Sequence, residues 1–542
     1  MENESELLAL RREKLEALRA RGIAPFGAAF ETSGDIAHVR ENFSDGIAFR
    51  IAGRITAHRN MGKSHFLDLR DASGRMQIYL QAKELGADAM EVFDLLDLGD
   101  FVGVEGTCFT TKTGEPTLKV RQFEVLAKSL RPLPEKWHGL QDVEARYRQR
   151  YLDLITNEQS RDVFIKRALV IREMRRFLEQ RGFIEVETPM LQSVPGGAAA
   201  EPFRTHHKAL GMDLYLRIAP ELYLKRLLVG GFNKVFELNR NFRNEGISRR
   251  HNPEFTMLEA YWAYANFEMM AELVEEMICH VAEKILETGD AKPETGNLKP
   301  KTVDESESSG RGGHDLTRIL KDVESKEAEG RAPSRPAERT KQSPSLLIEH
   351  RDPEGKVTRT INLTRPWRRA RYHDLVREVA GQEWFEISDQ QRRDRAKTLG
   401  VEILPQLVDF EVTQHVFEKL VEEKTYDPLF VTHCPKELVP LAKQNLDNPD
   451  IVDVYELIIN GVEISPGYTE LNDPLTQRQR LVEQAGEETQ RLDEDFLLAL
   501  EHGMPPAGGF GLGIDRLTML LTGAESIRDV ILFPLLKPKR LT

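Results

Sequence analysis

The stretch FELNRNFRNEGISRRHNPEFTMLEAYW, residues 236–262, determines the fold that we predict for this 542-residue chain. The segments KVFEL and FTMLEAYW at its two ends are apolar and rich in strand formers, so each predicts a buried strand. Between them lie four arginines together with Glu245 and His251. So much charge between two buried strands is typical of a phosphate or carboxylate clamp, but also of a solvated hairpin with surface ion pairs. The charge alone leaves both interpretations open.

Composition restricts the class of protein. The chain is 40% hydrophobic and 30% charged, which predicts a soluble globular protein of more than one domain. It has no apolar run of roughly 18 residues and no apolar N-terminal stretch, so we expect no membrane span and a cytoplasmic location. Three widely spaced cysteines argue against disulfides and against a zinc site. The net charge of −13 argues only weakly against a nucleic-acid partner, because a basic face can coexist with an acidic remainder.

Residues 46–134 show the pattern of a small barrel. Five short alternating segments are separated by turn residues, with a helical pattern near residues 81–95 between the third and the fourth. This order suits a Greek-key barrel of the OB type. Such barrels bind single-stranded nucleic acid or serve only as a scaffold, and the pattern does not separate these two roles.

The other regions divide the chain further. Residues 1–45 are expected to form an amphipathic helical extension with Leu7, Leu8, Leu15 and Leu18 on one side. We place a linker at 135–145 and a second, larger domain at 146–542. That domain begins with a long helix closed by Gly182, and FIEVETPML is expected to follow as a strand. An insertion at 288–345, rich in Pro, Gly, Ser, Lys and Glu, is predicted to be disordered.

Two further segments carry candidate chemistry. GGFGLGIDR, residues 508–516, lacks the spacing of a dinucleotide fingerprint, and Arg516 either meets an anionic phosphate or makes an ordinary ion pair. Glu456, Glu463 and Glu470 recur at a constant spacing of seven residues. In a strand–turn–strand unit they can converge, and carboxylate oxygens suit Mg²⁺ shared with substrate phosphates. Solvated surface acids are the alternative.

Three segments, in this order, resemble the three motifs of class II aminoacyl-tRNA synthetases: RGFIEVETPML, FRNEGISRRHNPEF and GLGIDR. Longer stretches, among them GGAAAEPFRTHH, LYLRIAPELYLKRLLVGGFNKVFELNRNFRNEG and YTELNDPLTQRQR, resemble the lysyl-tRNA synthetase family in particular. The resemblance covers nearly the whole chain except 288–345. It implies an α+β protein, with an N-terminal OB-type β-barrel and a class II synthetase catalytic domain built on an antiparallel β-sheet flanked by helices.

The resemblance also implies an activity. The family activates L-lysine with ATP to lysyl-adenylate, releases pyrophosphate, and transfers the lysyl group to the 3′ end of tRNA(Lys). No covalent enzyme intermediate is needed, so catalysis rests on positioning and on electrostatic stabilisation at the α-phosphate. The implied partners are ATP, L-lysine and tRNA(Lys), the implied cofactor is Mg²⁺, and a homodimer is the implied assembly.

By resemblance, Arg243 and Arg516 are the expected catalytic residues, on the phosphates and the substrate carboxylate. The resemblance implies ATP binding by Arg243, Glu245, His251, Asn252, Phe255, Glu456 and Arg516. Mg²⁺ is expected on Glu456 and Glu463. Lysine is expected on Gly197, Glu221, Arg243, Glu259, Tyr261, Tyr468 and Glu470, with the ε-ammonium at Glu259, Tyr261 and Glu470. In the barrel, the anticodon is expected on Arg59, Phe66, Gln77 and Glu115.

One residue departs from the family pattern, and two other functions compete. Pro466 stands where the family often has Asn, and proline cannot replace its side-chain hydrogen bond. An aspartyl- or asparaginyl-tRNA synthetase shares the barrel and core but needs a basic amino-acid pocket, which the acids of the expected lysine pocket argue against. A non-canonical RNA-binding paralogue predicts loss of Arg243, Arg516 or the metal acids, and all are present.

Overall fold

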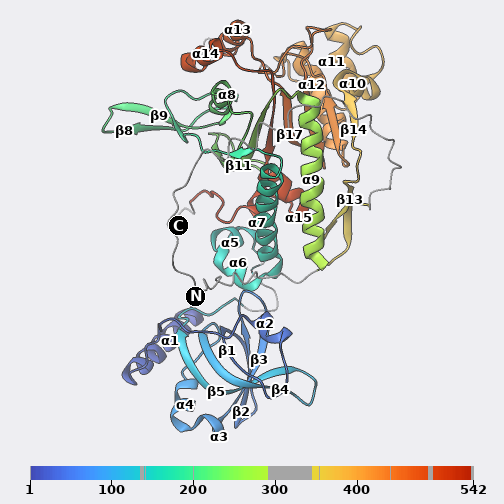
Figure 1. The fold of residues 1–542 in the computed structure, drawn as a ribbon. Helices are drawn as coiled ribbons and strands as arrows, with labels where there is room; N and C mark the ends of the chain where they lie inside the picture. Colours follow the sequence, from blue (N-terminus) through green and yellow to red (C-terminus); the bar gives the residue numbers. More distant parts are fainter. Residues whose placement is uncertain are drawn as a thin grey trace, which may run out of the picture. The chain divides into compact units, whose positions relative to one another are not determined.

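A computed structural model describes residues 2–134, 140, 142–198, 200–290, 345–352, 354–439, 441–485 and 492–538 (Figure 1). The insertion predicted at 288–345 lies outside these ranges except at its two ends. The α+β fold class is confirmed, with a closed barrel followed by a larger domain that is built on an eight-stranded sheet and helices. No helix in the described ranges combines the length and the apolar composition that crossing a bilayer requires.

The first domain is a closed five-stranded barrel with strand order β1-β2-β3-β5-β4. Its core consists of alternating apolar residues, such as Ile51 and Ile55 of β1 and Leu67 and Leu69 of β2. The pair α3 and α4 follows β3, as the helical pattern predicts. The elements of this domain are α1 (Glu2–Ala20), α2 (Ile36–Glu41), β1 (Ala48–Asn60), β2 (Ser64–Arg70), β3 (Arg75–Gln81), α3 (Ala82–Leu85), α4 (Ala87–Phe93), β4 (Phe101–Thr110) and β5 (Pro116–Ala127).

The N-terminal helix α1 differs from the expected amphipathic face. Leu15 and Leu18 are buried as predicted, but Leu7 is 41% exposed. Arg11 is buried instead, because its guanidinium donates to the carbonyl oxygens of Leu98, Ser129 and Arg131 at 3.0–3.1 Å. The helical spacing of apolar residues identifies only apolar positions, so it does not predict that an arginine is buried through its hydrogen bonds.

The second domain is built on an eight-stranded sheet of order β14-β15-β16-β17-β18-β11-β10-β6. Its central pairs are antiparallel, and the two outermost pairs, β14 with β15 and β10 with β6, are parallel. The strands predicted on either side of the charged connection are β10 and β11, which are confirmed. The strands of this sheet are β6 (Ile184–Glu185), β10 (Lys234–Phe242), β11 (Glu254–Ala263), β14 (Arg368–Arg371), β15 (Leu429–Thr432), β16 (Val454–Ile459), β17 (Val462–Thr469) and β18 (Ala507–Gly513).

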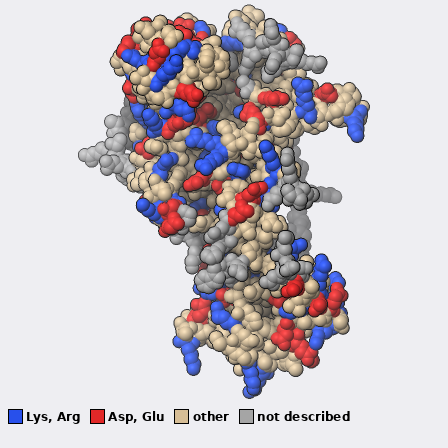
Figure 2. Space-filling view, turned by 180° about the vertical axis from the view of Figure 1, so that it is seen from behind, with Lys and Arg blue, Asp and Glu red and all other residues tan. Residues whose placement is uncertain are grey.

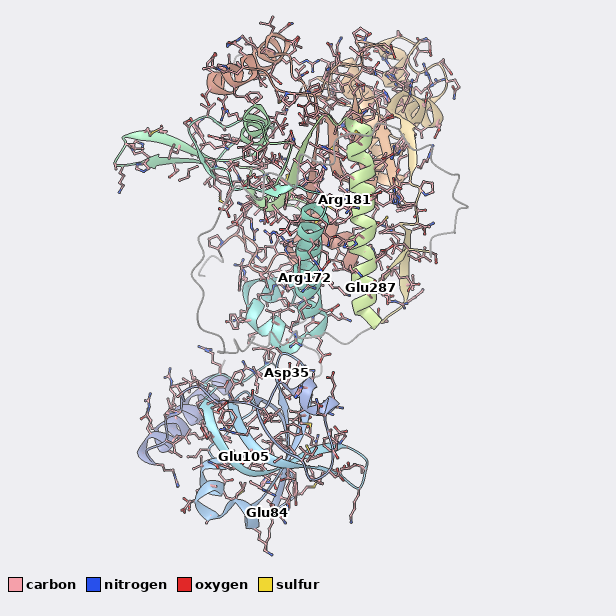
Figure 3. All side chains as sticks on the ribbon, viewed as in Figure 1. Asp35, Glu84, Glu105, Arg172, Arg181 and Glu287 are labelled. Carbon is pink, nitrogen blue, oxygen red and sulfur yellow. The ribbon has the colours of Figure 1, made fainter. Side chains whose placement is uncertain are left out.

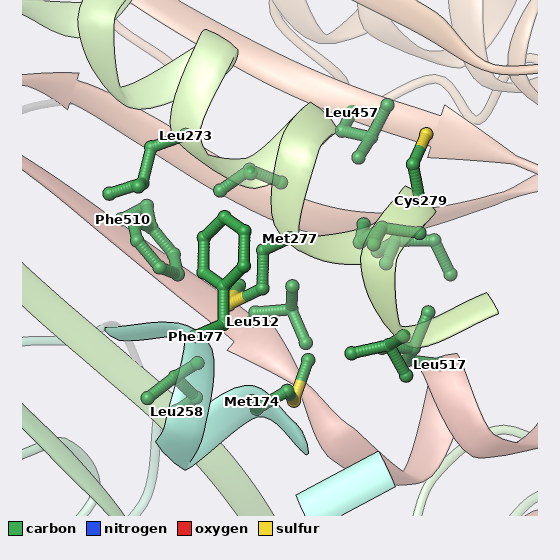
Figure 4. Packing of buried hydrophobic residues seen from close by; sticks show 14 of the residues in the cluster. Met174, Phe177, Leu258, Leu273, Met277, Cys279, Leu457, Phe510, Leu512 and Leu517 are labelled. Atoms are coloured by element: carbon green, nitrogen blue, oxygen red, sulfur yellow. The ribbon is translucent and has the colours of Figure 1, made fainter. Parts of the chain in front are cut away.

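The largest apolar core lies where α7 (Glu158–Glu179), α9 (Phe267–Asp290) and α15 (Ile514–Thr522) pack against this sheet (Figure 4). Met174 and Phe177 of α7 meet Met277 of α9 and Leu512 of β18 in this cluster. At the end of α7, Arg181, labelled in Figure 3, pairs with Glu276 of α9 at 3.0 Å. These helices cover one face of the sheet, so the opposite face is left for the site.

Smaller elements complete the second domain. The helices are α5 (Val143–Arg148), α6 (Arg150–Thr156), α8 (Glu221–Val229), α10 (Tyr372–Ala380), α11 (Asp389–Thr398), α12 (Asp409–Leu420), α13 (Pro474–Ala485), α14 (Glu494–Glu501) and α16 (Ile527–Val530), with a 3₁₀ turn η1 (Glu422–Lys424). Two small sheets consist of β12 (Leu347–Arg351) with β13 (Val357–Asn362), and of β7 (Leu191–Gln192), β9 (Met212–Leu216) and β8 (Arg204–His207).

Two expectations about this domain are wrong in detail. FIEVETPML is not one strand: only Ile184–Glu185 pairs with β10 and only Leu191–Gln192 pairs with β9. Pro189 lies between the two pieces, and proline lacks the N–H that a continuous ladder requires. The linker expected at 135–145 ends early, because α5 begins at Val143, where Asp142 caps it by accepting from the Glu144 N–H.

Candidate active site

The site begins as a row of residues on one face of the sheet. Register pairs Glu456 of β16 with Pro466 of β17, and Glu259 of β11 with Gly511 of β18. Residues opposite each other in an antiparallel pair share a face, and so do residues two apart. Tyr261 therefore lies on the same face as Glu259, as Tyr468 lies with Pro466. Most of the glycine-rich segment forms the strand β18, which presents Gly509 and Gly511 on this face, while Phe510 and Leu512 belong to the core on the other face.

A β-bulge brings the third acid onto this face. Glu463 and Pro466 are three residues apart, which in a regular strand places them on opposite faces. The pairing of β16 with β17 shifts between Leu457 and Ile458, so that Glu463 lies opposite Ile458. Ile458 is two residues from Glu456, and Glu463 therefore joins Glu456 on one face. The seven-residue spacing of the acids alone does not predict this.

The charged connection after β10 holds the arginine clamp. Arg243 is half-buried, with its guanidinium carbon 5.1 Å from the Phe255 ring centroid. Its Nε atom is buried and has no partner in the described part of the chain. Burial lowers the pKa of Arg243, although the carboxylates of Glu245, Glu259 and Glu463 oppose this. A desolvated guanidinium with open donor capacity is suited to an anionic ligand.

Arg516 approaches the same region from the start of α15. Its Nη1 atom donates to the Glu463 carbonyl oxygen at 2.7 Å, and Nη2 lies 3.4 Å from Nε2 of His251. Burial, and after it the charge of Arg516, lowers the pKa of His251. The positive charge of this corner therefore comes from the arginine side chains, and a neutral imidazole lies beside them.

The remainder of the connection does not continue the strand. Strand β10 ends at Phe242, and the Arg243 N–H donates to the Pro253 carbonyl oxygen. Glu245 is exposed and follows a turn, so it does not share a strand face with Arg243. Asn252 is buried and donates to the Glu254 carbonyl oxygen, while its own Oδ1 has no partner among the described residues.

The expected lysine pocket is a buried cluster of acids and tyrosines. Tyr261 donates to Glu259 at 3.1 Å, and Tyr468 donates to Glu221 at 3.0 Å. Glu470 is 1% exposed, and its Oε1 atom has no hydrogen-bond donor in the described ranges. At Gly509 a methyl group would collide with this Oε1 atom and lie 2.7 Å from the Tyr261 ring, so a side chain there would displace both.

Gly197 closes the pocket from a different loop. It has a φ of +87°, and a methyl group there would lie 3.1 Å from the Cβ atoms of both Ala219 and Glu221. The backbone at Gly197 thus passes directly against Glu221, and a side chain would force the two apart.

Burial controls protonation in this pocket. Desolvation, and after it the charge of Glu221, raises the pKa of Glu259 to about 8. Desolvation likewise raises the pKa of Glu470 to about 8, although a nearby ammonium opposes the shift. That ammonium belongs to Lys225, which the sequence analysis does not select, although a Glu and a Lys four residues apart on a helix are a recognisable pair.

Glu456 and Glu463 form the candidate metal position. Desolvation and the charge of Glu463 raise the pKa of Glu456 to about 8, and Glu418 and Glu422 add to this effect. Within the described ranges, no three His, Cys, Asp or Glu side chains are arranged to hold an ion by themselves. Mg²⁺ usually takes one or two carboxylates and completes its shell with water and substrate phosphates, so the pair suits it.

Two buried ion pairs, which sequence reasoning missed, support the clamp. Arg217 lies 2.6 Å from Glu237 and donates to the Arg240 carbonyl oxygen, and this fixes the end of β10. Asp515 accepts the Thr256 N–H at 2.8 Å and lies 2.6 Å from Arg167 of α7. The second pair connects the start of α15, and therefore Arg516, to β11.

In the barrel domain, the four residues expected at the anticodon gather on strands β1–β3 and at the start of β5. Arg59 lies opposite Phe66 and donates to Gln77 at 2.6 Å. Gln77 donates to Thr117 at 2.8 Å, and Glu115 accepts from Arg75 at 2.8 Å. The Phe66 and Tyr79 ring centroids are 4.8 Å apart. Tyr79, Arg75 and Asp68 belong to this face, although the sequence analysis does not single them out.

Charge is mixed over the surface. On the face shown in Figure 2, Lys and Arg side chains are interspersed with Asp and Glu. The excess negative charge of the chain, −13, is therefore not gathered into one acidic patch on this face. Local binding of an anionic partner is compatible with such a surface.

Comparisons with known proteins cover both domains. The family model described as tRNA synthetases class II (D, K and N) matches residues 142–537, and the model described as OB-fold nucleic acid binding domain matches residues 49–126. Proteins named lysine–tRNA ligase are similar over 99% of this chain. Those of Carboxydothermus hydrogenoformans, Syntrophomonas wolfei and Pelotomaculum thermopropionicum are 46%, 45% and 45% identical, over 99%, 98% and 96% of their own lengths.

Proposed function

We propose a role for each part of the site from the premise that this chain belongs to the lysine–tRNA ligases of the class II synthetase family. Its reaction joins L-lysine to the 3′ end of tRNA(Lys), through lysyl-adenylate and with release of pyrophosphate. The observation that supports the proposal best is that the Arg243 clamp interacts with Glu259 on the sheet face, and that Glu259 belongs to a buried cluster of acids with Glu221 and Glu470.

In the first step, a lysine carboxylate oxygen attacks the α-phosphorus and the bond to the β-phosphate oxygen breaks. Arg243 binds the lysine carboxylate and an α-phosphate oxygen, which brings two anions together and stabilises the charge of the transition state. Phe255 stacks on adenine, and Arg516, with His251 beside it, binds at the other phosphates. Glu245 and Asn252 lie at the nucleotide end of the clamp. No side chain is required as a nucleophile.

The acids of the pocket recognise the two ammonium groups of lysine. Glu221, with Gly197 behind it, accepts the α-ammonium, while Glu259, Tyr261 and Glu470 hold the ε-ammonium and Tyr468 orients Glu221. A buried carboxylate left unpaired is costly, so neutral analogues are rejected. An aspartyl or asparaginyl pocket needs a free cation, and the buried cation here, Lys225, is already paired with two carboxylates.

Glu456 and Glu463 would hold Mg²⁺ together with the ATP phosphates. When bound, the ion would neutralise phosphate charge and favour departure of pyrophosphate. Without it, Glu456 carries a pKa of about 8, so binding the ion to this pair competes with a proton.

We infer a homodimer that acts in the cytoplasm. Several apolar side chains at the start of the second domain are exposed in the single chain, which is unfavourable unless a partner covers them. They are Ile165 (46%), Ile184 (52%), Met190 (36%) and Leu191 (48%). Measurement of the mass in solution by light scattering tests this, since a monomer at working concentration contradicts it.

The function is tested by ATP–pyrophosphate exchange with each amino acid in turn, followed by charging of a tRNA with a UUU anticodon. Lysine alone should support exchange, and that tRNA should be charged. Exchange driven by aspartate or asparagine, or no exchange with any amino acid, contradicts the proposal.

Arg243→Ala should abolish exchange, because the carboxylate and the α-phosphate lose their common cation. Arg249→Ala is the matched control, because Arg249 lies on the same connection but is exposed to solvent. The proposed role of Arg243 is wrong if the two variants retain equal activity.

A further inference from the structure

A lysine of the protein itself lies inside the acidic pocket. Lys225 is one helical turn after Glu221 on α8, and its side chain is 0% exposed. Its Nζ atom is 2.6 Å from Oε1 of Glu221 and 2.6 Å from Oε2 of Glu470, which follows β17. The ammonium therefore bridges two acids that arise from elements far apart in the sequence.

Lys225 contacts one carboxylate oxygen of Glu221 and one of Glu470, and the second oxygen of each acid is not part of this bridge. Oε1 of Glu221 accepts from both Lys225 and Tyr468, whereas no hydrogen bond from the described residues reaches Oε2. Oε1 of Glu470 is buried and also has no donor in those ranges. An unsatisfied buried acceptor costs about 1–3 kcal/mol, so this Glu470 oxygen favours a ligand with an N–H group, and Oε2 of Glu221 is left available to the same ligand.

The charges of the pocket match those of free lysine. Three carboxylates, those of Glu221, Glu259 and Glu470, and one ammonium, that of Lys225, give a charge of −2 when all are ionised. Lysine brings two ammonium groups, and its carboxylate is left to Arg243. Without Lys225 the same acids would carry −3, which is more than lysine can neutralise.

We propose that Lys225 is a positioning residue for lysine recognition: its ammonium holds Glu221 and Glu470 at a fixed separation and directs their second oxygens to the substrate. This inference rests on the proposed function of the pocket. An amino acid with one ammonium group leaves a buried carboxylate uncompensated in the pocket and is rejected, so Lys225 contributes to specificity through the two acids.

The pocket's protonation gives the proposal a distinctive readout. The charged and titratable groups around Lys225 are Glu221, Glu259, Glu470, Tyr261 and Tyr468. Lys225 lowers the pKa of Glu470, which burial nevertheless holds at about 8. Removal of the ammonium raises that pKa further, so the substrate must displace a more tightly held proton at neutral pH.

The test compares Lys225→Gln, which keeps a donor and removes the charge, with Lys225→Arg, which keeps the charge. Lysine-dependent ATP–pyrophosphate exchange is measured with full-length protein from about pH 7 to about pH 9. For Lys225→Gln we expect the KM for lysine to rise about tenfold at pH 7, the effect of one pKa unit, and to approach wild type as pH rises. The KM for ATP should change less than about twofold, and Lys225→Arg should recover most of the loss.

Lys128→Gln is the matched control. Lys128 is also 0% exposed and bridges two carboxylates, those of Asp97 and Asp100, at 2.5 and 2.8 Å, but it belongs to the barrel. Its replacement should leave the KM for lysine unchanged at every pH, whatever it does to the melting temperature.

Three outcomes overturn the inference. In the first, folded Lys225→Gln binds lysine like wild type. In the second, its KM values for lysine and ATP rise together without pH dependence, as a merely structural defect predicts. The third outcome applies if Lys225→Gln does not fold, so that Lys225→Arg is the only variant available. If the KM of Lys225→Arg for lysine is then more than about tenfold above that of wild type while its kcat is unchanged, the proposal is refuted. Wild-type protein without lysine-dependent exchange refutes the proposed function instead.

Discussion

Pro466 is the residue at which, by the resemblance, we expect the pocket to differ from many members of the family. A methyl group placed on Gly511 would lie 4.0 Å from Cγ of Pro466 and 3.9 Å from Cγ of Glu259, so the proline ring flanks the expected ε-ammonium site. The ring offers no donor or acceptor there, whereas an asparagine would add a polar contact to the substrate. We therefore expect weaker lysine binding than in relatives with asparagine.

Pro466→Asn should lower the KM for lysine about two- to tenfold, as expected for one hydrogen bond of about 0.5–1.5 kcal/mol. The KM for ATP should not change. Pro474→Asn, at the half-buried first residue of α13, serves as control and should leave both constants unchanged. If the KM for lysine does not fall in Pro466→Asn, the rest of the pocket already makes up for the hydrogen bond that proline cannot form.

The two acids with a pKa of about 8 predict how lysine binding depends on pH. Below that pKa Glu259 and Glu470 hold protons in the empty pocket, and above it they are carboxylates that attract an ammonium. Because the pKa values are raised, binding is weak on the acid side and strengthens as pH rises through about 8. The KM for lysine should fall between about pH 6.5 and about pH 8.5.

Calorimetry provides the measurement for this pH dependence. At about pH 7, lysine binding in buffers of different ionisation enthalpy should show release of protons from the protein. Lysine binding to Glu259→Gln should release fewer protons than lysine binding to the wild-type protein. Proton uptake, or a KM for lysine that is flat over the window, would contradict the assignment of these acids to the ammonium site.

At the scale of elements, α15 depends on an ion pair at its first turn. Asp515 is 2% exposed, accepts the Thr256 N–H and pairs with Arg167, so it fixes the helix that carries Arg516 against β11 and α7. Removal of one charge from a buried pair leaves the other uncompensated. Asp515→Asn should lower the free energy of unfolding by roughly 3 kcal/mol and also reduce the exchange rate, because Arg516 loses its fixed start.

Asp495→Asn is the control for this element. Asp495 is 82% exposed and lies 3.5 Å from Arg226, so its loss should change the free energy of unfolding by less than about 0.5 kcal/mol. Denaturant unfolding and exchange kinetics give the two readouts. Equal behaviour of the two variants would mean that Asp515 does not hold the helix in place.

The elements also show how far the sequence alone predicts this structure. Periodicity and turn residues are sufficient for the barrel strands and for β10 and β11, because those signals are local. The bulge that turns Glu463 toward Glu456 depends on pairing between strands, and the burial of Arg11 depends on carbonyl groups of the barrel. Resemblance to a family supplied the site residues, but not Lys225 or Asp515, whose roles follow from contacts across the fold.

At the scale of the whole molecule, the two domains are expected to have different roles. Lysine activation, measured by exchange, and transfer to tRNA, measured by charging, allow these roles to be tested separately. We expect amino-acid activation to need only the sheet face of the second domain. We expect the barrel to contribute to charging alone, through the face on which Phe66, Arg59 and Tyr79 gather. A substitution there should therefore leave exchange intact while charging fails.

Phe66→Ala is the sharpest form of this prediction, because base–aromatic stacking is worth about 1–3 kcal/mol per base. The kcat/KM for charging tRNA with a UUU anticodon should fall about five- to 150-fold, while lysine-dependent exchange is unchanged. Phe26→Ala removes another barrel-side aromatic ring, 53% exposed and outside this face, and should leave both reactions intact. If Phe66→Ala lowers exchange and charging equally, its ring stabilises the protein and does not read the anticodon; if neither falls, recognition of tRNA lies elsewhere in the molecule.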